Sequence, residues 1–70
     1  MPAARKAATL IEALPYFQRC EKLDPNDVNT LIALREIYAR KDDLATSDIF
    51  KGRLEKVQSG GKNDSSYFQN

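Results

Sequence analysis

LDPNDV, residues 23–28, is the segment on which the fold of this chain depends. Pro25 disfavours the α-helical conformation at the residue before it, so the helical pattern that precedes the segment ends there. Asn26 and Asp27 then offer side-chain oxygens that can cap the first backbone N–H groups of a new helix. The segment is therefore typical of a sharp turn between two helices.

Apolar residues before this turn recur every three or four positions, which places them on one face of an α-helix. These residues are Leu10, Ala13, Leu14, Phe17, Cys20 and Leu23. Thr9 followed three residues later by Glu12 fits a capping box at the start of that helix. Inside a helix, Pro15 removes a backbone hydrogen bond and crowds a carbonyl group, which costs about 3 kcal/mol. We predict a helix over Leu10–Leu23 with a local distortion before Pro15.

The helix after the turn starts near Val28, ends near Arg40 and carries an unusually wide apolar arc. Steps of 100° per residue spread its apolar side chains over roughly 220° of the circumference. These side chains belong to Val28, Leu31, Ile32, Leu34, Ile37, Tyr38 and Ala39. An arc of this width predicts that neighbouring helices cover the central helix on more than one side.

A third helical pattern follows a second acidic turn, in which Asp42 and Asp43 can supply the N-cap. Apolar or small residues then repeat at helical spacing as far as Gln58, at Leu44, Ser47, Phe50, Leu54 and Val57. Residues 59–70 are rich in glycine and serine and show no helical periodicity, so we predict a flexible tail there. With three helical patterns, we predict an all-α fold.

The composition excludes several classes of function. Lysine and arginine total 11 against 10 acidic residues, so the net charge of +1 gives no strong field for nucleic acid or an anionic membrane. No apolar run approaches the roughly 20 residues of a membrane-spanning helix. Without histidine, and with Cys20 alone, the chain lacks the common zinc ligands and any internal disulfide. We expect no enzyme, metal or cofactor, and Cys20 as a small buried side chain.

The first and third helical patterns repeat each other at an offset of 34 residues. The shift aligns RCEKL with RLEKV, and it pairs Leu10 with Leu44, Tyr16 with Phe50, Arg19 with Arg53 and Glu21 with Glu55. A fixed offset between two helices with a third between them is typical of stacked helix pairs, because each pair buries its apolar face against its neighbours. The repeat therefore predicts an array of helix pairs.

With this period the chain resembles the tetratricopeptide repeat (TPR) family, whose unit is a helix-turn-helix of about 34 residues. The matching residues are Ala13, Phe17 and Pro25 in the first unit and Leu31, Leu34 and Tyr38 in the second. The resemblance implies an antiparallel helix-turn-helix array over residues 10–58, about one and a half units. Residues 1–9 would then be the remnant of a preceding helix or an extension of the first one.

Two residues depart from the pattern of the family. Arg35 stands where the family usually has glycine or alanine at the crossing of the two helices. Either its side chain extends outward along its aliphatic stem, or this helix pair is splayed. Lys51 falls where the family has an aromatic residue, so Phe50 beside it would have to fill the core.

The resemblance also implies a function: a protein-protein interaction module that binds a peptide or protein partner in a groove lined by the opening helices. The positions that match this groove are Asn29, Ile32, Ala33, Glu36, Ala39 and Arg40. Glu36 and Arg40 are separated by one helical turn, so an exposed ion pair is the simpler interpretation of these two residues.

Two alternatives stay open at the level of the sequence. One and a half units are fewer than the roughly three that a repeat array needs for independent stability. A second copy of the chain could therefore cover the apolar side of the first helix and form a homo-oligomer. A small nucleic-acid-binding helical protein is less favoured, because the near-neutral charge supplies little attraction to phosphates.

Overall fold

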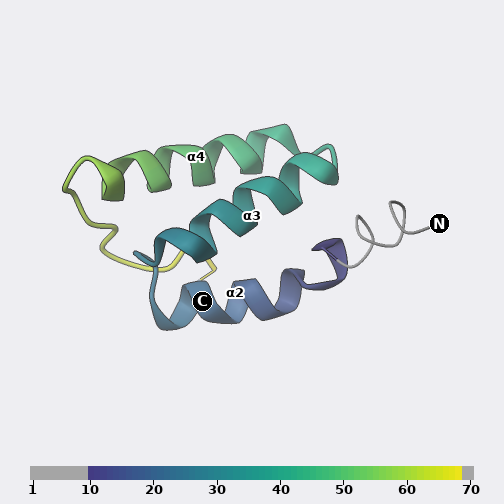
Figure 1. The fold of residues 1–70 in the computed structure, drawn as a ribbon, viewed down its shortest axis with the longest axis horizontal. Helices are drawn as coiled ribbons and strands as arrows, with labels where there is room; N and C mark the ends of the chain where they lie inside the picture. Colours follow the sequence, from purple (N-terminus) through teal and green to yellow (C-terminus); the bar gives the residue numbers. More distant parts are fainter. Residues whose placement is uncertain (1–9, 69–70) are drawn as a thin grey trace.

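The fold consists of helices that run in alternating directions, and the described residues 10–68 contain no strand. In the computed structural model, α2 spans Leu14–Leu23, α3 spans Val28–Arg40 and α4 spans Leu44–Gln58. Figure 1 shows α3 between α2 and α4, and α3 packs more extensively against α4 than against α2. The predicted all-α fold is confirmed, and α3 is covered on two sides as its wide apolar arc predicted.

A turn at Ala13 interrupts the first helical pattern. Residues 10–12 are helical, and α2 begins at Leu14 with Pro15 in its first turn. A proline is accepted at this point because the first N–H groups of a helix have no partner within it. The predicted distortion before Pro15 is confirmed. Thr9 of the predicted capping box, like all of residues 1–9, lies outside the described residues.

Aspartate side chains cap the two following helices. Asp27 accepts hydrogen bonds from the backbone N–H of Thr30 at 3.0 Å and from its hydroxyl at 2.6 Å. Asp43 accepts one from the backbone N–H of Thr46 at 3.2 Å. Asp42 adopts a φ of 62°, a left-handed conformation that ends α3 and turns the chain toward α4. The helix starts predicted from these acidic turns are confirmed.

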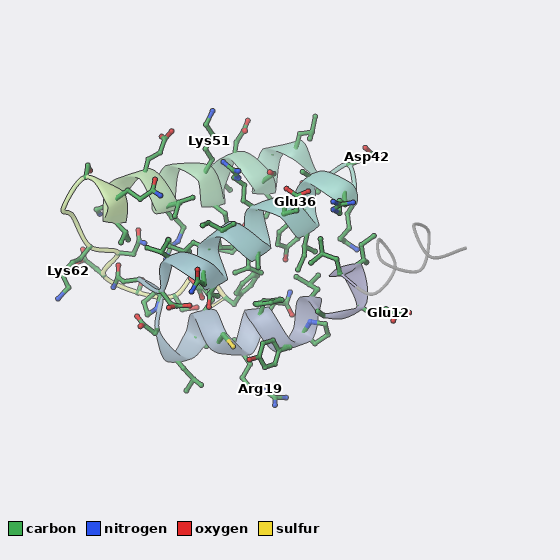
Figure 2. The ribbon with its side chains drawn as sticks, in the orientation of Figure 1. Glu12, Arg19, Glu36, Asp42, Lys51 and Lys62 are labelled. Atoms are coloured by element: carbon green, nitrogen blue, oxygen red, sulfur yellow. The ribbon has the colours of Figure 1, made fainter. Side chains whose placement is uncertain are left out.

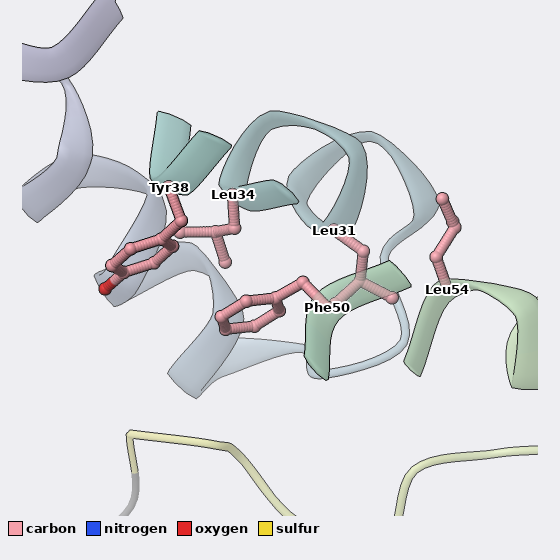
Figure 3. Packing of buried hydrophobic residues seen from close by; sticks show 5 residues of the cluster. All are labelled: Leu31, Leu34, Tyr38, Phe50 and Leu54. Atoms are coloured by element: carbon pink, nitrogen blue, oxygen red, sulfur yellow. The ribbon is translucent and has the colours of Figure 1, made fainter. Parts of the chain in front are cut away.

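The hydrophobic core lies mainly between α3 and α4 (Figure 3). Its buried cluster consists of Leu31, Leu34, Tyr38, Phe50 and Leu54. The rings of Tyr38 and Phe50 are stacked, with centroids 5.8 Å apart. From α2, Leu14 and Phe17 pack against this cluster. Because α2 contributes only partly buried side chains to it, the α3 and α4 pair forms the centre on which the rest of the chain packs.

The helices α3 and α4 approach each other closely where Arg35 crosses Ser47. The Ser47 hydroxyl donates a hydrogen bond of 2.9 Å to the backbone carbonyl oxygen of Arg35, and Ser47 is 8% exposed. The pair is therefore not splayed at this crossing. The small residue that allows the close approach is Ser47, and the Arg35 side chain is only partly buried.

Replacing Arg35 by alanine should leave the free energy of unfolding unchanged, or raise it by about 0.5 kcal/mol. The backbone carbonyl that accepts from Ser47 is retained, and neither ion pair of the described residues includes Arg35. Urea denaturation of the two chains measures the difference. A loss above about 1 kcal/mol would reveal a structural contact of the guanidinium group.

Residues 59–68 fold back against the helices, whereas the sequence analysis predicted a flexible tail over residues 59–70. Asn63 is 7% exposed, and Phe68 packs against the core cluster. The ring centroid of Phe68 lies 5.6 Å from that of Phe50. The last two residues of the predicted tail lie outside the described residues.

Two glycines make the reversal after α4 possible. Gly60 has a φ of 96°, a conformation that side-chain-bearing residues rarely adopt. A Cβ atom at Gly61 would lie only 2.9 Å from the backbone oxygen of Lys56. The glycines that suggested a flexible tail in the sequence therefore form a tight turn, which directs residues 62–68 back toward α2.

Candidate interaction surfaces

The six predicted groove residues lie along one side of α3, and we call them the α3 stripe. Its members are Asn29, Ile32, Ala33, Glu36, Ala39 and Arg40. The two alanines are partly buried, and the other four residues are at least partly exposed. The buried residues of α3 lie on the opposite side, at Thr30, Leu31, Leu34, Ile37 and Tyr38. The structure thus brings the predicted residues together on one accessible surface.

The charged pair in the α3 stripe is an exposed ion pair. Arg40 Nε lies 3.1 Å from Glu36 Oε2, and the two side chains are 44% and 48% exposed. The ion pair predicted from the spacing is confirmed, and such a pair contributes a few tenths of a kcal/mol. Figure 2 shows the position of Glu36 on α3. Ile32, which is 41% exposed, is then the largest apolar contact that the stripe offers.

A second apolar surface lies on the side of α2 that faces away from α3. Tyr16 is 62% exposed and Leu23 is 81% exposed, with the partly buried Cys20 between them in sequence. A hydrogen bond with Cys20 raises the pKa of the Tyr16 hydroxyl above 10.0. Figure 2 shows Arg19, on the same helix, pointing away from α3. We call Tyr16, Cys20 and Leu23 the α2 outer face. Both Cys20 and Leu23 were predicted to be buried, but Leu23 is exposed and Cys20 is only partly buried.

The side of α2 that faces the rest of the molecule carries Glu21. The sequence analysis predicted Cys20 and Leu23 on this side. Glu21 is 0% exposed, and its carboxylate accepts hydrogen bonds from three other groups. These donors are the backbone N–H of Tyr67 at 2.8 Å, Arg53 Nη2 at 3.3 Å and the Ser66 hydroxyl. A buried carboxylate is tolerated only with such partners. The periodicity of α2 alone could not reveal them, because they come from distant segments.

A second polar cluster joins the turn before α3 to the returning tail. The backbone N–H of Asn63 donates to Asn26 Oδ1 at 2.6 Å, and Asn26 Nδ2 donates to the carbonyl oxygen of Asn63 at 3.2 Å. The side-chain amide of Asn63 also donates to the carbonyl oxygens of Pro25 at 3.1 Å and Arg53 at 3.3 Å. Asn26, which the sequence suggested as a helix cap, instead binds the tail.

The sequence contained one signal for these tail contacts. Tyr67 and Phe68 are large aromatic residues in an otherwise polar segment, and both rings approach Phe50, at centroid distances of 5.1 Å and 5.6 Å. Aromatic residues have much apolar surface to bury, so their presence indicates a contact with a core. Nothing in the local sequence indicates which surface they contact.

Residues of α2 and α4 that match at the 34-residue offset are not equally buried. Glu21 is buried and its counterpart Glu55 is exposed, whereas Tyr16 is exposed and its counterpart Phe50 is 0% exposed. Phe17, one position further along, is the α2 residue whose packing corresponds to that of Phe50. The two helices therefore share a sequence pattern but do not present equivalent residues to α3.

The described residues 10–68 contain no group of three or more histidine, cysteine, aspartate or glutamate side chains placed to hold a metal ion. None of the helices in this part of the chain combines the length and the apolar character required to cross a membrane. Comparison with protein family models, characterised proteins and solved structures finds no match for this chain. A functional proposal therefore depends on the α3 stripe, the α2 outer face and the tail contacts.

Replacing Glu21 by alanine should lower the free energy of unfolding by about 3 kcal/mol. The change leaves Arg53, whose side chain is 21% exposed, without its carboxylate partner, and it removes the acceptor for the Tyr67 N–H. The matched change Glu55→Ala should cost less than about 0.5 kcal/mol, since Glu55 is exposed. Urea denaturation gives both values, and equal effects of the two changes would contradict the structural role of Glu21.

Proposed function

We propose that this chain is a protein-protein interaction module of the tetratricopeptide type, which binds a peptide or protein partner along the α3 stripe without catalysis. The observation that supports this proposal is the placement of all six stripe residues on one side of α3. Ile32 is 41% exposed there, and it does not belong to the core cluster on the opposite side of the helix.

The chemistry of the α3 stripe suits a partner peptide. Ile32 offers apolar surface, and the small side chains of Ala33 and Ala39 let a partner backbone approach the helix closely. Asn29 and the ion pair of Glu36 with Arg40 provide polar groups along the same side of the helix, between Ile32 and Ala33. Specific interfaces combine apolar anchor residues with polar groups that make hydrogen bonds to the partner. We expect a partner with an apolar anchor side chain that packs on Ile32.

Selection from a peptide display library tests this proposal, because it requires no choice of partner in advance. The selected peptides should lose at least about tenfold in affinity for the Ile32→Asp variant, which corresponds to about 1.4 kcal/mol. Ile49→Asp is the matched control, because Ile49 on α4 is also 41% exposed and lies outside the stripe. Selected peptides that bind both variants equally well, or a selection without any enriched peptide, would contradict the proposal.

A second candidate function is self-association through the α2 outer face. The 81% exposure of Leu23 and the 62% exposure of Tyr16 favour it, because a second copy of the chain could bury both side chains. The sequence analysis left such a homo-oligomer open, with the second copy on the apolar side of the first helix. The contact residues proposed here are instead those of the α2 outer face.

Light scattering over a range of concentrations tests self-association. We expect a dimer whose dissociation constant rises at least about tenfold on the change Leu23→Lys. Leu44→Lys is the control, since Leu44 is 63% exposed on α4. A wild-type chain that is monomeric at every concentration would exclude this candidate function.

A further inference from the structure

We propose that α2, α4 and the turn before α3 form a second peptide-binding surface, which we call the tail site. Glu21, Asn26, Phe50 and Arg53 form it, and residues 63–68 of the same chain occupy it in this structure. Its ligand in trans is a peptide from another protein that follows the same bent course as residues 63–68. That peptide carries an asparagine, a serine three positions later and a phenylalanine five positions later.

The tail site binds mainly the backbone of the segment that occupies it. The Asn26 amide contacts both the N–H and the carbonyl oxygen of Asn63. The Glu21 carboxylate accepts from the backbone N–H of Tyr67, and Arg53 Nη2 donates to the carbonyl oxygen of Ser65. Main-chain hydrogen bonds give affinity for a bound peptide without depending on its side chains, as they do when a peptide adds to the edge of a sheet. Every peptide has these backbone groups, so a segment from another chain can make the same four contacts.

Besides the Tyr67 ring, which also lies against Phe50, three side chains of the bound segment make contacts that would select a particular sequence. The Asn63 amide donates to two backbone carbonyl oxygens, at 3.1 Å and 3.3 Å. The Ser66 hydroxyl donates to the Glu21 carboxylate. The Phe68 ring packs against Phe50. These contacts give the pattern of the ligand, in which asparagine, serine and phenylalanine keep the spacing of residues 63, 66 and 68.

The polar lining of the tail site allows it to exist without a ligand. Water can hydrate the Glu21 carboxylate, the Arg53 guanidinium and the Asn26 amide once the segment leaves, so the Phe50 ring is the one apolar group of the four that loses its cover. In the occupied site, Arg53 Nε is buried and has no hydrogen-bond partner among the described residues. A buried donor without an acceptor is unfavourable. A ligand that places an acceptor beside this atom would bind better than the chain's own segment.

The chain's own segment competes with any external peptide. It is joined to α4 by residues 59–62, and a short linker of this kind gives an effective concentration on the order of millimolar. An external peptide therefore binds weakly until the internal segment is displaced or weakened. The apparent dissociation constant of the external peptide rises as the fraction of molecules with a free site falls.

The test compares the binding of a fluorescent peptide of residues 62–68 to two full-length chains. One chain is the wild type, and the other carries Asn63→Ala and Phe68→Ala, which weaken the internal segment and leave the tail site intact. We expect the double variant to bind the peptide at least about tenfold more tightly than the wild type. A control peptide with the same two substitutions should bind neither chain. Circular dichroism verifies that the variant is folded, and Phe68→Ala alone replaces it if it is not.

Three results would overturn the proposal. In the first, a folded variant binds the peptide no more tightly than the wild type. In the second, the control peptide binds as tightly as the matching one. In the third, the chain forms dimers by exchanging residues 63–68 and does not bind the free peptide, which would assign the tail site to a second copy. Ile32→Asp should leave peptide binding unchanged, so this test is independent of the proposed function of the α3 stripe.

Discussion

Replacing Phe50 by alanine should lower the free energy of unfolding by about 3–5 kcal/mol. Phe50 is 0% exposed and belongs to the core cluster between α3 and α4. Its ring also lies within 5.1–5.8 Å of the rings of Tyr38, Tyr67 and Phe68. Alanine therefore leaves a cavity and removes aromatic contacts on two sides. Because small domains have a total stability of only about 5–15 kcal/mol, a loss of this size removes a large share of it.

Urea denaturation followed by far-UV circular dichroism measures this loss. Tyr16→Ala is the control, because Tyr16 is an aromatic residue of another helix with 62% of its surface exposed. Its loss should stay near about 0.5 kcal/mol. Phe50→Ala should also speed amide hydrogen exchange at Tyr67, since the tail loses the ring against which it packs. A loss below about 1.5 kcal/mol for Phe50→Ala would contradict its central place in the core.

Replacing Leu34 by alanine should cost about 2–5 kcal/mol. Leu34 is 0% exposed in the middle of α3, where it packs in the same cluster as Leu31 and Phe50. The surrounding helices cannot close the cavity completely, because the close contact between Arg35 and Ser47 limits how far α4 can move. The cost therefore combines the lost burial of the leucine with the cavity that remains.

Leu44→Ala provides the matched control for Leu34→Ala. Leu44 is 63% exposed at the start of α4, and its replacement should cost no more than about 0.5 kcal/mol. The midpoint of thermal unfolding, measured for both variants and the wild type, gives the comparison. Similar losses for the two leucines would mean that exposure does not distinguish them in solution, which would contradict the packing of α3 against α4.

The helices and their limits could be predicted because the signals for them are local. Pro25 and Asp27 end α2 and start α3 through contacts with residues only a few positions away, and Asp43 does the same for α4. The wide apolar arc of α3 likewise predicted correctly that helices lie on both sides of it. The six residues of the α3 stripe were chosen from the resemblance to the tetratricopeptide family, and their role in binding stays a prediction.

The inward side of α2 could not be predicted in the same way. Periodicity favoured Cys20 and Leu23 as buried residues, but the structure buries Glu21 and exposes Leu23 to 81%. A carboxylate can replace a leucine at a buried position only when donors surround it. The donors come from Arg53, Ser66 and Tyr67, which lie 32 to 46 residues further along the chain.

The sequence by itself determined three helices, the turns between them and the side of α3 that faces the core. These features depend on hydrogen bonds between near neighbours and on the helical period, both of which can be recognised in a short stretch of residues. Only the tertiary structure decided the orientation of α2 and the return of residues 59–68. Both depend on hydrogen bonds from distant segments to the buried Glu21 carboxylate and the buried Asn63 amide. Such hydrogen bonds form only after these segments have come together, so no short stretch of sequence indicates them.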